Sequence, residues 1–173
     1  FDSVPNKKNI SLAFIAPFNL DKIDIDSIEN TKKYLEKLNL STLSLDFYSG
    51  TLSALETAKK LGIKIKLDTY DNKNSFEEID RISNIKKIKN YDFILGPFIP
   101  RNINKLSSNL QGLDVPIISP LTSNEIELNK NVFQSIPSKK LQRELMFSYV
   151  DSLIVKDPDP CVMIIYDSTS EKQ

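Results

Sequence analysis

Residues 91–138, YDFILGPFIPRNINKLSSNLQGLDVPIISPLTSNEIELNKNVFQSIPS, carry the clearest fold signal in this chain. They contain two short apolar runs, Phe93–Leu95 and Val115–Ile118, which are separated by a segment of helical length. Each run stops at a turn-forming pair that contains proline, Gly96–Pro97 in the first case and Ser119–Pro120 in the second. Short apolar runs that are bounded by turn residues and joined by a helix predict a β-α-β unit of a parallel sheet.

Further apolar runs continue this alternation on either side. Residues Ile10–Ala16 are almost uniformly apolar, as expected for a strand that is covered on both faces. Residues Ile63–Tyr70 alternate apolar and polar side chains, and their polar side includes Lys64 and Lys66. Such alternation is typical of an edge strand, where lysines also discourage pairing with other chains. The sequence therefore predicts an α/β fold, a three-layer αβα domain whose parallel sheet contains strands 10–16, 63–70, 92–95, 115–118 and 132–136.

Helices are expected between these strands. The clearest helix is capped by Ser41 or Thr42, and Gly62 offers the left-handed residue that ends it. Residues 75–78, Ser-Phe-Glu-Glu, have the spacing of a capping box and predict a helix that continues to about Asn90. The expected helices span 31–38, 42–61, 75–90, 101–111 and 139–155, with a short turn or helix over 125–131.

Apolar periodicity indicates which helical side chains face the core. In the helix 42–61 the expected stripe is Leu45, Tyr48, Leu52 and Leu55. In the helix 75–90 the expected inward residues are Phe76, Ile79, Ile82, Ile85 and Ile88. In the helix 139–155 they are Leu141, Leu145, Met146, Tyr149 and Leu153.

Composition argues against nucleic acids and membranes as partners. The 173 residues include 23 basic and 23 acidic side chains, so the formal net charge is zero, whereas a phosphate-binding surface needs a basic excess. The two basic clusters, Lys86–Lys89 and Lys139–Lys140, are interpreted as solvated helix faces. No apolar run approaches the ~20 residues that a membrane span requires.

The sequence also predicts that this chain is not an enzyme and holds no cofactor or metal. Histidine, the commonest general base and metal ligand, is absent. No GxSxG, Walker or GxGxxG motif occurs, and Glu77, Glu78 and Asp80 fall on one helical turn instead of facing each other across a cleft. The single Cys161 permits no internal disulfide and is expected to act as a small apolar residue at the start of a sixth strand, 161–166.

Several segments together resemble the first lobe of type I periplasmic ligand-binding proteins, which include the amino-acid receptors of ABC transporters. The resemblance covers about residues 9–166. The segments that carry it are PFNL, LDFYSGTLSALETAKKLGIKIKLDTYD, ILGPFIP, VPIISPLTS and NVFQSIPS. They look most like the domain that accompanies peptidoglycan-binding LysM repeats in Bacteroidetes envelope proteins. The resemblance implies the sheet order 2-1-3-4-5, which agrees with the edge position predicted for Ile63–Tyr70.

The resemblance also implies a domain organisation. Residues 1–9 read as a linker or tail, 10–138 as the first lobe, and 139–173 as the truncated start of a second lobe, with the crossover near Ser135–Ser138. Because residue 1 is Phe and no signal-peptide pattern begins there, the chain is expected to be a processed or excised piece of something longer. In the family the ligand is clasped between lobes, and a cleft that buries most of a small ligand needs both walls.

Candidate ligand contacts lie in the turns that follow the strands, because ligands of parallel sheets bind beyond the carboxyl ends of the strands. In relatives that bind amino acids, the Ser-Pro turn holds the carboxylate and ammonium of the ligand. An ordinary turn is the alternative, since such residues are common in turns. An aromatic residue next to Gly-Pro can equally serve as a lid on the end of the sheet. The candidate contacts are Ser119, Thr122, Ser123, Phe98, Pro100 and Phe18, and Gly96 is expected to open its backbone toward the cleft.

Two functions are compatible with these patterns. One is a non-catalytic receptor-like domain in the periplasm or cell envelope that binds a small molecule or an amino-acid-like ligand. The other is an envelope scaffold that uses the same fold to bind proteins. Under either function, the apolar segment 139–166 is expected to fold back on the chain, to pair with a second copy or to pack against another protein. Peptidoglycan binding would require sequence outside these 173 residues. A response-regulator-like domain is the rival fold, but Ala16-Pro17-Phe18 stand where its clustered acids would follow the first strand.

Overall fold

A computed structural model of the chain describes residues 9–156, 159–161 and 163, and these are the residues considered below. The chain divides into two compact units, Phe1–Ser138 and Lys139–Gln173. The predicted sixth strand falls largely outside the described residues. Cys161 and Met163, which belong to that stretch, are exposed and lie in no strand.

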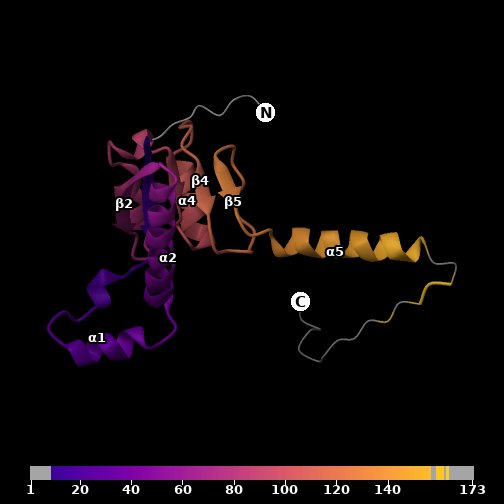
Figure 1. The fold of residues 1–173 in the computed structure, drawn as a ribbon, viewed down its shortest axis with the longest axis horizontal. Helices are drawn as coiled ribbons and strands as arrows, with labels where there is room; N and C mark the ends of the chain where they lie inside the picture. The colour runs from indigo at the N-terminus through magenta and orange to yellow at the C-terminus, as the bar shows by residue number, and fades with distance from the viewer. Residues whose placement is uncertain (1–8, 157–158, 162, 164–173) are drawn as a thin grey trace. The chain divides into compact units, whose positions relative to one another are not determined.

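Five strands of the described chain form one parallel sheet in the order β2-β1-β3-β4-β5, as predicted (Figure 1). The observed bounds lie within two residues of the expected ones at each end. β4 begins after Pro116 because proline has no N–H to donate to a neighbouring strand. The strands are β1 (Asn9–Ala16), β2 (Lys64–Asp71), β3 (Phe93–Leu95), β4 (Ile117–Ser119) and β5 (Val132–Gln134).

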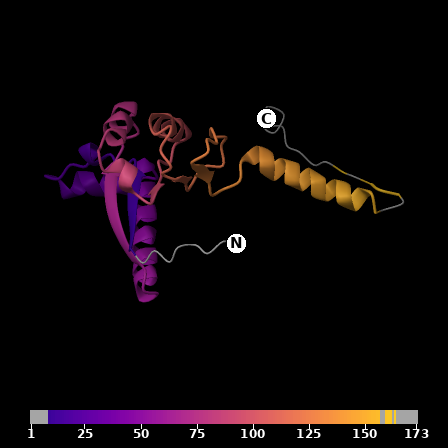
Figure 2. The same ribbon diagram turned by 90° about the horizontal axis from the view of Figure 1, so that it is seen from above.

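The sheet separates two hydrophobic clusters. Helix α2 (Leu40–Lys60) covers one face, while α3 (Phe76–Ser83) and α4 (Pro100–Asn109) cover the other (Figures 1 and 2). On the α3–α4 side, Ala13 and Ile15 of β1 pack against isoleucines and leucines of both helices. On the α2 side, Phe14 and Ala16 pack among aromatic rings. Consecutive residues of β1 therefore point into opposite clusters, which explains its continuous apolar sequence.

Helix α2 starts two residues earlier than expected. Its N-cap is Asn39, whose Oδ1 accepts hydrogen bonds from the backbone N–H of Ser41 (2.8 Å) and Thr42 (3.0 Å). The Thr42 hydroxyl accepts in return from the N–H of Asn39 at 3.0 Å, which completes a capping box. Thr42 therefore belongs to the capping box, but at its third helical position; the N-cap itself is Asn39, not Ser41 or Thr42 as expected. Gly62 follows the helix with φ +82°, as predicted.

The expected helix 75–90 is shorter in the structure. Helix α3 ends at Ser83, and only a short 3-10 turn, η2 (Ile88–Asn90), follows. The Ser83 hydroxyl donates to the Ile79 carbonyl (2.6 Å) and the Asn84 amide donates to the Asp80 carbonyl (2.9 Å), so side chains take over the last acceptors of the helix. Phe76, predicted to face the core, is 50% exposed and lies against the guanidinium of Arg101.

The other helices differ less from expectation. α1 (Ile28–Leu35) and α4 lie close to their predicted positions, whereas residues 125–131 contain no helix. α5 (Lys139–Ile154) makes up the described helix of the second unit. Its predicted inward side chains are 46–65% exposed, so the expectation that they face a core is wrong for the described structure. These are Leu141, Leu145, Met146, Tyr149 and Leu153.

The edge strand β2 is only partly open to solvent on its polar side. Lys64 and Lys66 are exposed, but Asp68 is covered by an ion pair with Lys87. The Tyr91 hydroxyl donates to the same carboxylate at 2.8 Å and lies 2.6 Å from the hydroxyl of Tyr70. The basic cluster 86–89 was expected to be a solvated helix face. For Lys87 this expectation is wrong, because its ammonium pairs with Asp68. Lys87 anchors the segment before β3 to the edge of the sheet.

This cluster changes the pKa of three groups. The Lys87 ammonium, helped by the Tyr91 hydroxyl, holds the pKa of Asp68 below its usual value. The Asp68 carboxylate raises the pKa of Lys87 in turn. Burial, followed by the hydrogen bonds with Tyr70 and Asp68, raises the pKa of Tyr91.

Gly96 provides a test of the packing between β1 and β3. It lies directly after β3 with φ +97°, and an added Cβ would lie 2.0 Å from the backbone oxygen of Ile15. Its position at the end of the strand is as predicted, but β1 closes this side of its backbone. We expect Gly96→Ala to lower the free energy of unfolding by about 3 kcal/mol or more, measured by urea denaturation.

Gly50 is the matched control, because it lies in α2 and an added Cβ there would meet no atom within 4 Å. Gly50→Ala should raise the free energy of unfolding by about 0.5–1 kcal/mol, since alanine loses less backbone entropy in a helix. Equal effects of the two substitutions would contradict the close approach of Gly96 to Ile15.

The Asp68–Lys87 pair predicts a specific acid sensitivity. Because the pKa of Asp68 is lower in the folded state, the pair stabilises the protein above the unfolded pKa of about 3.9. That stabilisation disappears as the pH falls through the folded pKa. We expect Asp68→Asn to be less stable than the parent at pH 6 and to approach it near pH 2, measured by urea denaturation across this range.

Asp80 keeps part of the acid sensitivity in both proteins, because Lys105 lowers its pKa as well. The test is therefore the difference in the free energy of unfolding between parent and variant at each pH. Two stability curves that stay parallel from pH 6 to pH 2 would argue against the pair.

Candidate functional site

The carboxyl ends of the parallel strands meet at one edge of the sheet, which we call the carboxyl edge. Four turns form this edge: Pro17–Leu20 after β1, Asn72–Asn74 after β2, Gly96–Ile99 after β3 and Pro120–Asn124 after β4. All six predicted site residues belong to these turns or adjoin them. The structure thus brings together residues that lie up to 105 positions apart, between Phe18 and Ser123.

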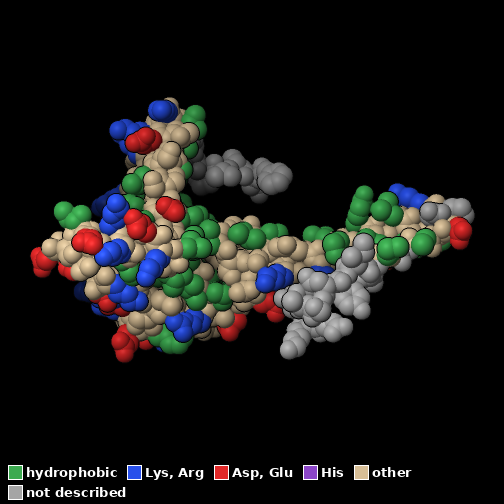
Figure 3. All heavy atoms as spheres, turned by 90° about the horizontal axis from the view of Figure 1, so that it is seen from below, with side chains coloured by type: hydrophobic (Ala, Val, Ile, Leu, Met, Phe, Trp, Pro, Cys, Tyr) green, Lys and Arg blue, Asp and Glu red, His purple; other side chains and the backbone are tan. Residues whose placement is uncertain are grey.

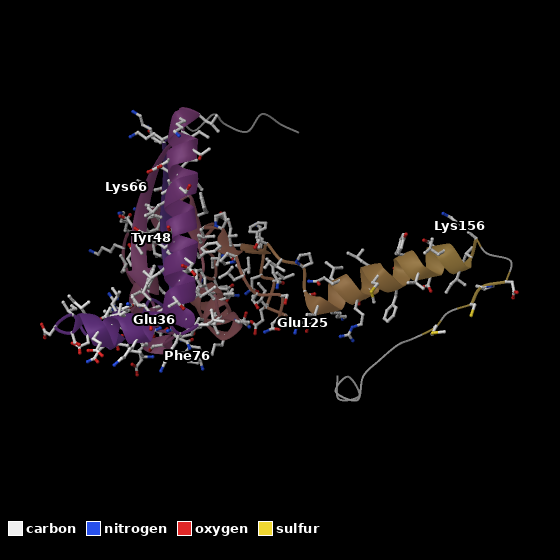
Figure 4. All side chains as sticks on the ribbon, turned by 60° about the horizontal axis from the view of Figure 1, so that its bottom comes forward. Glu36, Tyr48, Lys66, Phe76, Glu125 and Lys156 are labelled. Atoms are coloured by element: carbon white, nitrogen blue, oxygen red, sulfur yellow. The ribbon has the colours of Figure 1, made fainter. Side chains whose placement is uncertain are left out.

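Phe18 and Phe98 lie largely inside the protein at this edge. They are 5% and 3% exposed and belong to an aromatic cluster with Phe14, Phe47 and Tyr48. Phe98 packs edge to face against Phe47, with 5.3 Å between the ring centroids. Phe18 packs in the same way against Tyr48, which projects from α2, with 5.8 Å between the ring centroids (Figure 4). The packing favours the interpretation of Phe98 as a lid on the sheet, and ligand contact through either ring stays a prediction.

The turn after β4 is held in place by the next strand. Gln134 of β5 donates through Nε2 to the carbonyls of Thr122 and Asn124, both at 2.8 Å. The Ser135 hydroxyl donates to the carbonyls of Ser119 (2.9 Å) and Pro120 (3.0 Å). The carbonyls of four residues at this turn are thus held from one side before any ligand arrives.

Within this turn the three candidate hydroxyls differ. Thr122 is buried, and its hydroxyl accepts the N–H of Asn124 at 3.1 Å, so it supports the turn itself. Ser119 is fully buried, and its Oγ has no hydrogen-bond partner among the described residues. Ser123 is half-buried, and its hydroxyl is not used in the described hydrogen bonds. Pro100, the first residue of α4, is also half-buried.

Asp71, at the end of β2, organises the neighbouring turns. Its carboxylate accepts hydrogen bonds from the backbone N–H of Asn19 (3.1 Å), Leu20 (2.9 Å) and Lys73 (2.9 Å). Asn19 has the left-handed φ of 52°, and its amide donates to the carbonyl of Pro17 (2.9 Å) and to the hydroxyl of Ser41 (3.2 Å). One carboxylate therefore couples the turns after β1 and β2.

The structure reveals a polar hollow that sequence reasoning missed. It has a volume of about 380 Å³, and turns after β1 and β2 contribute lysines to it. Lys73 also lies 3.8 Å from Glu78. In the sequence, this hollow is indicated only by turn-forming residues that follow the strands β1 and β2. Their turns become neighbours because β1 and β2 pair in the sheet. The hollow is lined by Asn19, Lys22, Tyr34, Asn39, Leu40, Lys73 and Asn74.

Two buried asparagines near the edge were also missed. Asn72 is fully buried, and neither its Oδ1 nor its Nδ2 has a partner among the described residues. Asn102 donates to Asn74 at 3.0 Å, but its own Oδ1 is unpaired. In the sequence these residues look like ordinary turn and helix residues, since burial depends on the packing of α4 over the sheet.

The described residues contain no cluster of three His, Cys, Asp or Glu side chains that could hold a metal ion. Among the helices of the described chain, none is long and apolar enough to cross a membrane.

Comparisons with known proteins place this arrangement in context. No family model matches the sequence, and no curated protein matches it. Solved structures do match. An ABC transporter substrate-binding protein from Desulfitobacterium hafniense in complex with Leu has a TM-score of 0.56 at 16% identity, over 83% of this chain and 39% of its own. A leucine binding protein from Thermotoga maritima has a TM-score of 0.56 at 16% identity, over 83% and 37%.

A branched-chain amino acid transporter substrate binding protein from Streptococcus pneumoniae, in complex with isoleucine, has a TM-score of 0.56 at 17% identity, over 86% of this chain and 39% of its own. The fold is that of a type I periplasmic binding protein lobe. At such low identity the likeness extends to the fold alone. The lobe described here, with the second unit, spans about two fifths of the length of these proteins.

Asp71 allows a test of how the carboxyl edge of this lobe is organised. Asp71→Ala leaves three backbone N–H groups without their acceptor, so we expect a loss of about 2 kcal/mol in the free energy of unfolding. Hydrogen exchange at the amides of Asn19, Leu20 and Lys73 should become faster. Asp71→Asn keeps one acceptor oxygen and should show a smaller change. Unaltered exchange at all three amides in Asp71→Ala would refute this role.

Proposed function

We propose that residues 10–138 form the first lobe of a non-catalytic, receptor-like binding domain, and that residues from Lys139 onward begin its second lobe. The ligand would be a small amino-acid-like molecule that binds at the carboxyl edge. The fold supports this proposal, and so do the solved structures of similar proteins whose bound ligands are Leu and isoleucine. The resemblance to type I periplasmic ligand-binding proteins motivates a periplasmic or envelope location for this chain.

The observation that carries the proposal is the turn Pro120–Asn124. Gln134 and Ser135 fix its backbone from one side, which leaves the Ser123 hydroxyl available on a pre-formed turn. A binding group that is already in place loses less conformational entropy when the ligand binds. Preorganised hydroxyl and N–H groups suit the carboxylate of an amino acid.

The surroundings of this turn favour a ligand with an apolar side chain. Leu121 is half-buried and packs against the aromatic cluster that contains Phe18 and Phe98. A carboxylate at Ser123 would therefore have an apolar surface beside it. The polar hollow at the ends of β1 and β2 contributes Lys22 and Lys73 to the same edge of the sheet.

A single lobe supplies one wall of such a site. Because pockets that hold small ligands usually bury most of the ligand surface, we expect this chain alone to bind weakly, with a Kd of about 1 mM or higher.

A scaffold function is the alternative, and one observation favours it. Phe18, Phe98 and Ser119 are almost fully buried, so only part of the predicted contact set faces the edge. Such a lobe could serve as an envelope scaffold without a small ligand. The association with LysM repeats, and peptidoglycan binding through them, rests on the sequence resemblance and would involve residues outside this chain.

The experiment is a titration of the isotope-labelled chain with leucine and isoleucine, followed by amide NMR shifts. We expect concentration-dependent shifts confined to the amides of residues 98, 99 and 121–124, with a Kd of about 1 mM or higher. Ser123→Ala should weaken binding by about three- to ten-fold, which corresponds to one hydrogen bond. Ser108→Ala, at an exposed position of α4, is the matched control and should bind as the parent does.

Shifts that stay absent at about ten times the expected Kd, or that appear only away from the carboxyl edge, would overturn the receptor proposal and favour the scaffold.

A further inference from the structure

The polar hollow at the ends of β1 and β2 is large enough to hold a small molecule. Its volume of about 380 Å³ falls in the range of small-ligand pockets, about 300–1,000 Å³. All of its lining residues lie between Asn19 and Asn74, so the first unit alone forms its walls. The turn after β2 is three strand positions from the turn after β4, or about 14 Å. The hollow is therefore separate from the proposed amino-acid site.

The lining of the hollow carries positive charge. Lys22 and Lys73 belong to it, whereas no Asp or Glu does. Lys22 takes part in none of the ion pairs among the described residues. Lys73 lies 3.8 Å from Glu78, but the same carboxylate has a closer partner, the Nε of Arg81, at 2.7 Å. Glu78 thus compensates only part of the charge of Lys73.

Asp71 adjoins the hollow, and its carboxylate is already occupied. Both of its oxygens accept hydrogen bonds, from the backbone N–H groups of Asn19, Leu20 and Lys73. A carboxylate that accepts several N–H groups has much of its charge compensated by their dipoles. Asp71 therefore shapes the two turns and leaves the ammonium groups of the hollow for another anion.

Several hydrogen-bond donors of the lining are unused. The backbone N–H and the Nδ2 of Asn74 take part in none of the described hydrogen bonds, and neither does the backbone N–H of Leu40. Two side-chain oxygens of the lining are already occupied. The Oδ1 of Asn39 accepts two N–H groups of the α2 capping box, and the Oδ1 of Asn74 accepts from Asn102. Unused donors beside two cations suit an anionic ligand.

The walls of the hollow are held in place without a ligand. Asn19 donates through Nδ2 to the carbonyl of Pro17 and to the hydroxyl of Ser41, and the Tyr34 hydroxyl lies 2.8 Å from the same Ser41 oxygen. Because Ser41 already accepts from Asn19, its own proton can go to Tyr34, which leaves the Tyr34 proton for a ligand. Groups fixed in advance lose less conformational entropy on binding.

The surface around the hollow does not attract anions in general. On the face of the first unit seen in Figure 3, basic and acidic side chains are interspersed. The formal net charge of the chain is zero. Surface charges more than about 8 Å apart are largely screened at physiological salt. Recognition of an anion therefore depends on the lysines and donors of the hollow itself.

We propose that the polar hollow binds the phosphate group of a small organic molecule. A phosphate ester carries close to two negative charges at neutral pH and three acceptor oxygens, which match two ammonium groups and the unused N–H groups. A carboxylate has one charge and uses fewer of these partners. The hollow is larger than a phosphate group, so its remaining space accepts the organic part. This inference does not rest on the proposed amino-acid site.

The test is a titration of the isotope-labelled 173-residue chain with inorganic phosphate and with glycerol 3-phosphate, followed by amide NMR shifts at constant ionic strength. We expect shifts at the amides of Leu40 and Asn74, with a Kd of about 1–10 mM for both probes. The amides of residues 121–124 should not respond. Acetate, the singly charged comparison, should bind at least ten-fold more weakly.

Variants of the two lysines test their contribution. Lys22→Gln and Lys73→Gln should each weaken binding of glycerol 3-phosphate at least three-fold, since each removes a charge-assisted hydrogen bond. Lys60→Gln is the matched control, because it removes the same charge at an exposed position about 30 Å along α2 from Leu40. Its affinity should equal that of the parent. Circular dichroism of all three variants should match the parent, because all three lysines are exposed.

Three results would overturn the proposal. The first is the absence of shifts at about ten times the expected Kd. The second is an equal loss of affinity in Lys60→Gln and in the two hollow variants, which would indicate binding through overall charge. The third is acetate binding as strong as that of glycerol 3-phosphate, which would exclude a phosphate site. Each leaves the titration with leucine and isoleucine unaffected, so the two proposals fail separately.

Discussion

Burial of β1 from both faces is the constraint on which the rest of the lobe depends. Residues Leu12–Ala16 are all buried, and β1 pairs in parallel with β2 on one side and β3 on the other. Side chains of β1 alternate between the cluster under α3 and α4 and the aromatic cluster under α2. Close packing against β3 leaves no space for a Cβ at Gly96. Because β2 and β3 pair with β1, the position of β1 also fixes where these strands end and where their turns begin.

That edge is organised by hydrogen bonds that cross between turns. Asp71 links the turns after β1 and β2, and Gln134 with Ser135 supports the turn after β4. Rigid turns at the ends of parallel strands are where this architecture places ligands. The Asp68–Lys87–Tyr91 cluster has a different role, because it ties the segment before β3 to the edge strand. The turns proposed to bind a ligand and the cluster that anchors β3 therefore use separate groups of polar residues.

The two faces of the sheet are covered unequally. α3 and α4 bury one face, whereas on the other face α2 covers the aromatic cluster and Phe133 of β5 stays exposed. Helix α5 also keeps apolar side chains exposed.

The sequence by itself determined the parallel sheet and the positions of its strands, because apolar periodicity and Gly and Pro punctuation are local signals. The edge position of β2 followed from Lys64 and Lys66 in the same way. The full strand order was expected only from the resemblance to type I periplasmic ligand-binding proteins. Only the tertiary structure decided which side chains those elements cover. The shortened α3, the exposed Phe76 and the buried Phe98 and Ser119 all depend on neighbours distant in sequence. The polar hollow and the Asp71 hydrogen bonds were hidden for the same reason, since they join turns about 50 residues apart whose proximity arises when β1 and β2 pair.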